Sequence, residues 1–325
     1  MLKWTVRILV LLLVLLAGAF LVFRTPDTDP DAMRAKYGAP PSQFLAIDNT
    51  RTVHLRDEGP RDGNADAPAI VLLHGSNADL HTWQPWAKAL RRDYRVIRFD
   101  QRGHGLTGPA PDGDYTRGAF VADVERLVRR LGLERFVLGG NSMGGGIALA
   151  YALEHPDKLA GLVLVDAAGA PVRREPVEGE ESGTNIGFAI AQMPVVNSLV
   201  TQITPRSLIR QSLSQSVENQ AIVTDAAVDR YWELLRYPGN RAATLERFGT
   251  PREAFAAQDL AGLDVPVLVM WGEEDSLIPF AASAWFADAL TNAQEVSYPG
   301  IGHIPMEEAP ERSAADLVAW LRTLE

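Results

Sequence analysis

The chain has 325 residues, 46% hydrophobic and 22% charged, a balance typical of a folded globular protein. Acidic residues outnumber basic ones by 41 to 31, giving a net charge of −10, and no basic block occurs beyond the extreme N-terminus, so nucleic-acid binding is excluded. Cysteine is absent, which excludes disulfides, thiolate metal ligands and cysteine catalysis.

Residues 1–24 predict a transmembrane signal anchor. Trp4 to Phe23 carries a single charge, Arg7, and Ile8 to Phe23 is apolar without a break. About twenty residues at ~1.5 Å each span the roughly 30 Å hydrocarbon layer. Basic residues precede the run and acidic ones follow, so we expect a cytoplasmic N-terminus and a catalytic domain on the periplasmic side of the cell membrane. Cleavage after Ala17-Gly18-Ala19 and secretion is the alternative, but the apolar run continues beyond that point.

The segment 25–43 predicts a tether, because proline and glycine stand among polar residues there. Beyond it, short apolar runs alternate with helical patterns, which predicts an open, mostly parallel α/β sheet with helices on both faces. Strands are expected at residues 44–48, 52–56, 69–73, 95–99, 136–138, 162–166, 265–271 and 294–298.

The regular alternation is lost between residues 170 and 256. An insertion of this size between two core strands predicts a helical cap over the functional site. The chain would then consist of a first core part at 44–169, the cap at 170–256, and a second core part at 257–325.

A nucleophile motif follows the apolar run at 136–138. Gly140-Asn141-Ser142-Met143-Gly144 has the Gly-x-Ser-x-Gly spacing, and a helical pattern comes directly after it. A serine on such a tight strand-to-helix turn is held in strained backbone angles that keep its Oγ exposed, and side chains two residues away would collide. We therefore predict that Ser142 is the nucleophile.

The partners of this serine are expected at other strand ends, because ligands of open α/β sheets bind there. His303 follows the last predicted strand between glycine residues, and Asp275 follows the strand at 265–271. A serine needs a neutral imidazole as base and a carboxylate to orient that imidazole. We predict His303 as base and Asp275 as acid, with Asp166, which also ends a strand, as the alternative acid.

The oxyanion hole should pair the backbone N–H of Met143 with that of Ser76. Ser76 lies in the loop that follows the strand at 69–73, beside His74, whose side chain we interpret as structural. Asp100 and His104 belong to another glycine-rich loop, and we interpret them as residues that shape that loop.

From about residue 44 onward the sequence resembles the α/β-hydrolase superfamily. Within it, the segments 139–145, 164–169 and Gly302-His303-Ile304-Pro305-Met306-Glu307 resemble bacterial lipases and esterases grouped as family V. That resemblance implies a secreted or envelope-associated serine hydrolase acting on carboxylic esters. Meta-cleavage-product hydrolases, which cut C–C bonds, share the Gly-Asn-Ser-Met-Gly-Gly turn.

Together these features predict a serine hydrolase that cleaves small-molecule esters or lipids through an acyl-enzyme, without metal or cofactor. The alternatives are a C–C bond or lactone hydrolase with the same Ser142, His303 and Asp275, and a non-catalytic binding protein of the same fold.

Overall fold

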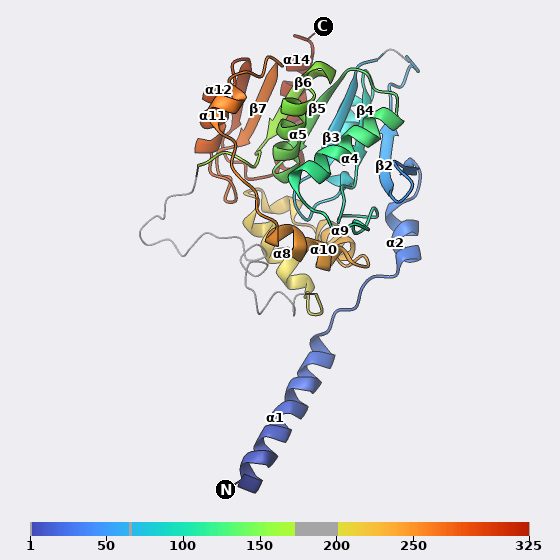
Figure 1. The fold of residues 1–325 in the computed structure, drawn as a ribbon, viewed down its shortest axis with the longest axis vertical. Helices are drawn as coiled ribbons and strands as arrows, with labels where there is room; N and C mark the ends of the chain where they lie inside the picture. Colours follow the sequence, from blue (N-terminus) through green and yellow to red (C-terminus); the bar gives the residue numbers. More distant parts are fainter. Residues whose placement is uncertain (1, 65–66, 173–200, 325) are drawn as a thin grey trace.

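The computed structural model describes residues 2–64, 67–172 and 201–324. Its sheet has the strand order β1-β2-β4-β3-β5-β6-β7-β8 (Figure 1). Strands β3 to β8 pair in parallel, whereas β1 and β2 are antiparallel to their neighbours. The strands are β1 (Ser42–Ala46), β2 (Thr52–Glu58), β3 (Ala69–Leu73), β4 (Arg95–Phe99), β5 (Phe136–Asn141), β6 (Leu159–Val165), β7 (Val267–Gly272) and β8 (Ala293–Tyr298). The predicted open, mostly parallel sheet is confirmed.

The sheet is buried on both faces because its central strands are apolar at every position. Val71 and Leu73 of β3 pack in one core cluster with α4 and α5, whereas Ile70 and Leu72 pack in the other with α3 and α14. The covering helices are α3 (Gln84–Leu90), α4 (Arg117–Arg130), α5 (Met143–Glu154), α11 (Ala257–Leu260), α12 (Ala281–Ala289), α13 (Pro305–Glu308) and α14 (Pro310–Leu321), with short 3₁₀ turns η1 (Leu80–Trp83), η2 (Pro156–Lys158) and η3 (Gln220–Ile222).

Strand β3 lies between β4 and β5, so the chain reverses its direction of progress across the sheet at this point. The loops leaving β3 and β5 therefore diverge to opposite sides and leave a crevice at their carboxyl ends. The predicted nucleophile follows β5, and the predicted oxyanion loop follows β3. The topology thus brings these two segments together.

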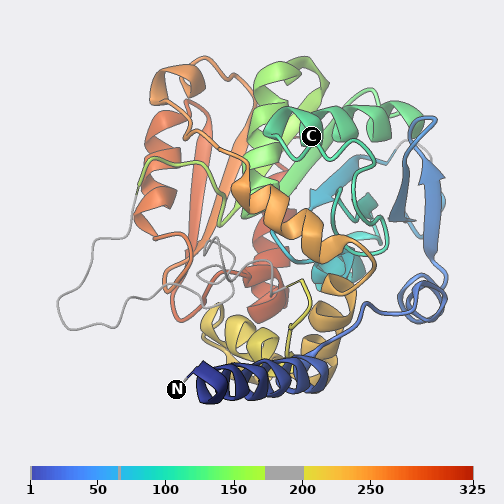
Figure 2. The ribbon, with the colours of Figure 1, turned by 60° about the horizontal axis from the view of Figure 1, so that its bottom comes forward.

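Between β6 and β7 the chain forms α8 (Arg206–Gln215), α9 (Asp225–Leu235) and α10 (Asn240–Gly249). These helices lie together at one end of the sheet, as Figures 1 and 2 show. We call residues 201–256 the cap helices. The first part of the predicted cap, residues 173–200, falls outside the described residues.

The N-terminal region differs in one respect from the sequence prediction. Helix α1 (Leu2–Phe23) is long and apolar enough to cross a membrane, and it leaves the body on the side of the cap helices (Figures 1 and 2). The expected tether, however, contains helix α2 (Pro30–Tyr37). Pro30 does not break this helix because it occupies the first turn, and Asp29 caps it by accepting the N–H of Ala32 at 2.8 Å.

The segment between α1 and α2 is also attached to the cap helices. The Arg241 guanidinium of α10 donates to Thr25 O at 2.8 Å and to Asp27 Oδ1 at 2.6 Å. Thr28 N donates to Arg236 O at 2.9 Å. Residues 25–37 are therefore bound to the body and do not form a free linker.

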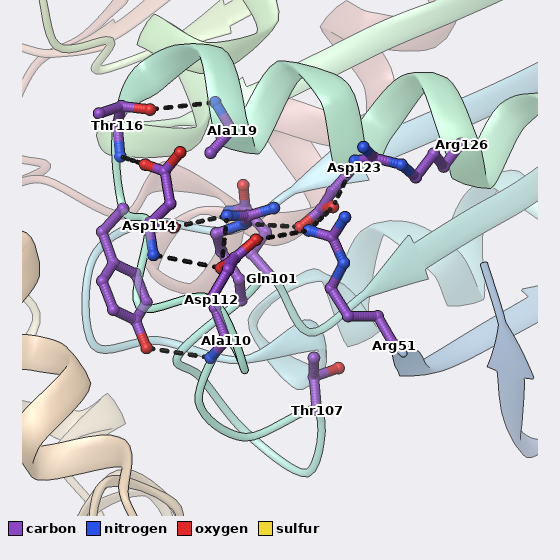
Figure 3. A network of polar contacts seen from close by, with 12 residues as sticks. Arg51, Gln101, Thr107, Ala110, Asp112, Asp114, Thr116, Ala119, Asp123 and Arg126 are labelled. Atoms are coloured by element: carbon purple, nitrogen blue, oxygen red, sulfur yellow. Dashed lines mark hydrogen bonds and ion pairs between the residues drawn. The ribbon is translucent and has the colours of Figure 1, made fainter. Parts of the chain in front are cut away.

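A polar network with a buried centre joins the β1–β2 turn, the loop after β4 and helix α4 (Figure 3). Asp123 of α4 lies at its centre, 2.6 Å from Arg51 Nη1, 2.7 Å from Arg102 Nε and 3.2 Å from Arg126 Nη1. We call this network the arginine–aspartate cluster; its members are Asp48, Arg51, Arg102, Asp112, Asp123 and Arg126.

Candidate active site

Ser142 stands on the turn between β5 and α5, with φ 55° and ψ −120°. Positive φ is costly for a residue with a side chain, and the tight packing of the turn maintains it. A Cβ on Gly140 would lie 2.3 Å from the Gly144 carbonyl, and one on Gly144 would lie 2.3 Å from Leu73 O. The strained turn and its need for glycine, both predicted from the motif, are present.

The predicted base and acid are brought together by the loops after β8 and β7. His303 Nδ1 lies 2.7 Å from Asp275 Oδ2, and both side chains are buried. Asp275 is itself fixed by the N–H groups of Leu277 and Ile278, which donate to Oδ1 at 2.7 and 3.1 Å. The hydrogen bond between His303 Nδ1 and Asp275 assigns the imidazole proton to Nδ1, so Nε2 is the nitrogen that can accept a proton from Ser142.

Asp166, the alternative acid, lies beside this pair. Oxygen and nitrogen atoms of Asp166, Asp275 and His303 all lie within 4.8 Å of one another. The Gly272 N–H donates to Asp166 Oδ1 at 2.9 Å, whereas Asp166 Oδ2 is buried and has no hydrogen-bond partner among the described residues. Burial and the charge of Asp275 raise the pKa of Asp166 well above its usual range, so its neutral form is favoured.

Such a grouping of two carboxylates and an imidazole could also hold a cation. In this chain the His303 nitrogen that faces the carboxylates already shares a hydrogen bond with Asp275. The raised pKa of Asp166 accounts for its close approach to Asp275, because a neutral acid does not repel the neighbouring carboxylate. The geometry is therefore that of two carboxyl groups, Asp275 and Asp166, beside the His303 imidazole, and not that of a cation site.

The predicted oxyanion loop lies against the nucleophile turn. A Cβ on Gly75 would be 3.2 Å from Ser142 Cβ, and Ser76 lines the same pocket as Ser142. Met143 is the first residue of α5, where backbone N–H groups have no acceptor within the helix and the helix dipole is positive. The two predicted donors thus belong to segments that meet beside Ser142.

A pocket joins these groups to the cap helices. Ser142, His303 and Ser76 stand on its core side. Thr204, Ser212, Ser216, Tyr231 and Thr244 also line its cap side, but most of the pocket surface is apolar. Its apolar lining includes Leu208, Ile209, Leu213, Leu235, Leu245, Leu277 and Ile304. The charged lining residue from the cap, Arg241, is paired with Asp27 at 2.6 Å. Among the described residues, then, the pocket presents hydrocarbon to a ligand.

The sequence comparisons agree with this architecture. The model of the alpha/beta hydrolase fold family matches residues 68–310. The chain belongs to this family. The hydrolase is 28% identical over 265 residues to 2-hydroxymuconate semialdehyde hydrolase of Pseudomonas sp. (strain CF600), covering 78% of this chain and 86% of that protein. It is 25% identical over 273 residues to Lipase 3 of Moraxella sp. (strain TA144), covering 79% of this chain and 78% of that protein.

Among solved structures, the hydrolase resembles a membrane phospholipase A described as a novel bacterial virulence factor. The TM-score is 0.74, with 100% of this chain and 99% of the other covered at 22% identity. At this identity the likeness concerns the fold alone.

The histidines and acids that we interpreted as structural serve the loops around the site. His74 is buried; its Nδ1 lies 2.8 Å from Gly75 O and its Nε2 accepts the Gln101 N–H at 3.0 Å. Asp100 accepts the N–H groups of Leu80 and Leu106 at 2.8 and 2.7 Å. These bonds hold the loops after β3 and β4 against each other.

Other residues of the hydrolase contribute to the site without a recognisable sequence signal. Asn141 Nδ2 donates to His303 O at 3.0 Å and so ties the nucleophile turn to the histidine loop. Glu308 accepts the N–H of Gly302 at 2.9 Å and that of Glu218 at 2.9 Å, which joins the histidine loop to the cap helices. Sequence reasoning missed both, because neither stands in a motif that fixes its partner.

Proposed function

We propose that this hydrolase cleaves carboxylic esters of lipid-like substrates through an acyl-enzyme formed on Ser142. The observation that carries the proposal is the His303–Asp275 hydrogen bond of 2.7 Å at a pocket that His303 shares with Ser142. A buried serine, imidazole and carboxylate at strand ends of this fold supply the groups that acyl transfer requires.

In the proposed reaction, His303 Nε2 takes the Ser142 Oγ proton while Oγ attacks the ester carbonyl carbon. The N–H groups of Ser76 and Met143 stabilise the resulting oxyanion. Collapse of this intermediate breaks the bond to the alcohol, which leaves with the proton from His303. Water then attacks the acyl-enzyme by the same route and releases the carboxylic acid.

Two features support a lipid-like substrate. The surface of the described pocket is mainly apolar, with leucine and isoleucine side chains from α8, α9 and α10. Helix α1 leaves the body on the side of these cap helices, so an anchored enzyme would hold its cap near the membrane (Figure 1). We propose that α1 is retained as an anchor and that the catalytic domain lies on the periplasmic side. Lipase 3 of Moraxella and the membrane phospholipase A carry names consistent with this substrate class.

C–C bond hydrolysis is the second candidate, because 2-hydroxymuconate semialdehyde hydrolase is among the relatives. One solved neighbour is named as a hydrolase of a phenylhexadienoate, an anion. A dienoate carboxylate would need a cationic partner in the pocket, yet Arg241 is already paired with Asp27. Among the described residues, this favours ester over dienoate substrates.

A fluorophosphonate probe tests the proposal directly. We expect the purified full-length protein to be labelled and the Ser142→Ala variant to remain unlabelled, with esterase activity lost by at least ~10³-fold. p-Nitrophenyl esters from acetate to palmitate should be hydrolysed faster than a dienoate. Absence of labelling, or labelling that persists in Ser142→Ala, would contradict the serine-hydrolase proposal.

A further inference from the structure

Arg247 is a fully buried arginine of the cap helices that contacts the oxyanion loop. It lies in the last turn of α10, with no exposed surface. Its guanidinium donates to Ser76 Oγ and, at 2.6 Å, to Asn77 Oδ1. Nη1 also lies 3.7 Å from Met143 Sδ. One side chain thus contacts both residues whose N–H groups form the proposed oxyanion hole.

The charge of this guanidinium has no carboxylate partner among the described residues. Other buried arginines do have one: Arg98 lies 2.5 Å from Glu58, and Arg102 lies 2.7 Å from Asp123. Burial and the nearby Arg252 lower the pKa of Arg247 to about 9, which leaves it positive at neutral pH. A buried unpaired charge is costly for folding, so its retention calls for a compensating use.

We propose that Arg247 is a positioning residue for the oxyanion hole: it holds the Ser76–Asn77 loop in place from the cap and sets behind the developing oxyanion a positive charge that no carboxylate of the described residues pairs. Charges preorganised around a site of developing negative charge are among the largest contributors to catalysis. Arg247 does not line the pocket, so it acts on the transition state and not on an anionic group of the substrate. The inference rests on the acyl-enzyme mechanism proposed above.

This arrangement also makes the oxyanion hole dependent on the cap. The loop after β3 belongs to the core, whereas α10 belongs to the cap helices, and Thr244 of α10 adds a second bond to Asn77 Oδ1 at 3.1 Å. The donor loop is therefore fixed when α10 is seated on the core.

The test compares Arg247→Met with Arg247→Lys in the full-length protein, using a short-chain p-nitrophenyl ester. We expect Arg247→Met to lower kcat by about 10- to 100-fold, less than the ~10²–10³-fold typical of a lost direct donor, because the two N–H groups remain. KM should stay within about twofold, since the substrate does not contact Arg247. Binding of a trifluoromethyl ketone, whose hemiketal with Ser142 carries an oxyanion, should weaken by the same factor as kcat.

Arg247→Lys separates the charge from the shape of the side chain. Lysine keeps the charge at neutral pH, so kcat should recover in part relative to Arg247→Met. Burial lowers the pKa of a lysine, and the variant should therefore lose activity as pH rises through that lowered pKa. At pH values well below 9, where Arg247 with its pKa of about 9 stays positive, neither the wild type nor Arg247→Met should show this loss, and a purely structural role would not produce it.

Arg252→Gln is the matched control. It removes a positive charge next to Arg247, and the Arg252 side chain donates to the Arg247 carbonyl at 3.2 Å instead of to the Ser76–Asn77 loop. Its kcat should be that of the wild type. The inference is overturned if folded Arg247→Met keeps kcat within twofold of the wild type, if its loss lies in KM alone, or if Arg252→Gln reproduces it. Should Arg247→Met not fold, the pH profile of Arg247→Lys decides: a profile that follows the wild type overturns the inference. If the inference about Arg247 fails while fluorophosphonate still labels the wild type, the proposed serine-hydrolase function stands.

Discussion

The arginine–aspartate cluster and the candidate active site differ in how their charged side chains are paired. In the arginine–aspartate cluster, Asp123 lies within 3.2 Å of three guanidinium groups, so each charge has an opposite one beside it (Figure 3). In the candidate active site, Asp166 lies beside another carboxylate, and among the described residues Arg247 has no acid partner. Opposite charges are paired in the first region, whereas in the second one acid favours its neutral form and one arginine has no acid partner among the described residues.

The difference separates charges that serve folding from charges that serve chemistry. A buried ion pair recovers part of its desolvation cost from its partner, and removing one member leaves an uncompensated charge. An unbalanced buried charge recovers no such energy, and such groups concentrate at functional sites. We therefore expect substitutions in the first region to change stability and substitutions in the second to change rates.

The largest effect is expected at Asp275. Asp275→Asn keeps the shape of the side chain but removes the charge that orients His303, and kcat should fall by about 10⁴-fold. Asp166→Asn is the matched control, because an amide reproduces a neutral acid and can still accept the Gly272 N–H; its kcat should stay within about tenfold of the wild type. Steady-state kinetics of both variants decide. If Asp166→Asn is the inactive one, the acid has been assigned to the wrong residue.

An intermediate effect, on stability alone, is expected at Asp123. Asp123→Asn leaves three guanidinium groups around a neutral side chain and should lower the free energy of unfolding by about 3–5 kcal/mol, as for other broken buried pairs. No member of the cluster lines the pocket, so kcat per folded molecule should not change. Urea unfolding and active-site titration measure the two quantities. Glu134→Gln, an exposed residue between α4 and β5, serves as control. A drop in kcat at Asp123→Asn would remove the distinction between the regions.

The sequence predicted those parts of the fold that depend on local patterns. Apolar runs such as Ala69–Leu73 are fully buried strands, and the glycine spacing around Ser142 fixes a turn that leaves no space for side chains. Helix α2 was missed because proline at its start was interpreted as a loop signal, although proline suits the first helical turn. That error arose from one position and did not affect the sheet.

Long-range pairings are what the sequence did not reveal. Arg247 and Ser76 are separated by 171 positions, and Asn141 and His303 by 162. The first contact depends on how the cap helices pack on the core and the second on how two core loops pack together, and no periodicity or motif encodes either arrangement. Spacing could place Ser142, Asp275 and His303 at strand ends, but the environment that favours a neutral Asp166 follows only from three-dimensional packing.

The smallest effect sharpens the comparison through pH. The pKa of Asp166 is raised in the folded protein, first by burial and then by Asp275, so its contribution to stability is present below the unfolded-state pKa of about 4 and is lost as pH rises toward the folded-state pKa. Asp166→Asn lacks this loss. Its Tm should match the wild type near pH 4 and exceed it increasingly toward pH 8. In an Asp275→Asn background the gain should shrink, because the neighbouring charge is gone. Parallel Tm curves for wild type and Asp166→Asn would show that Asp166 is charged in the folded state and that the site is balanced in some other way.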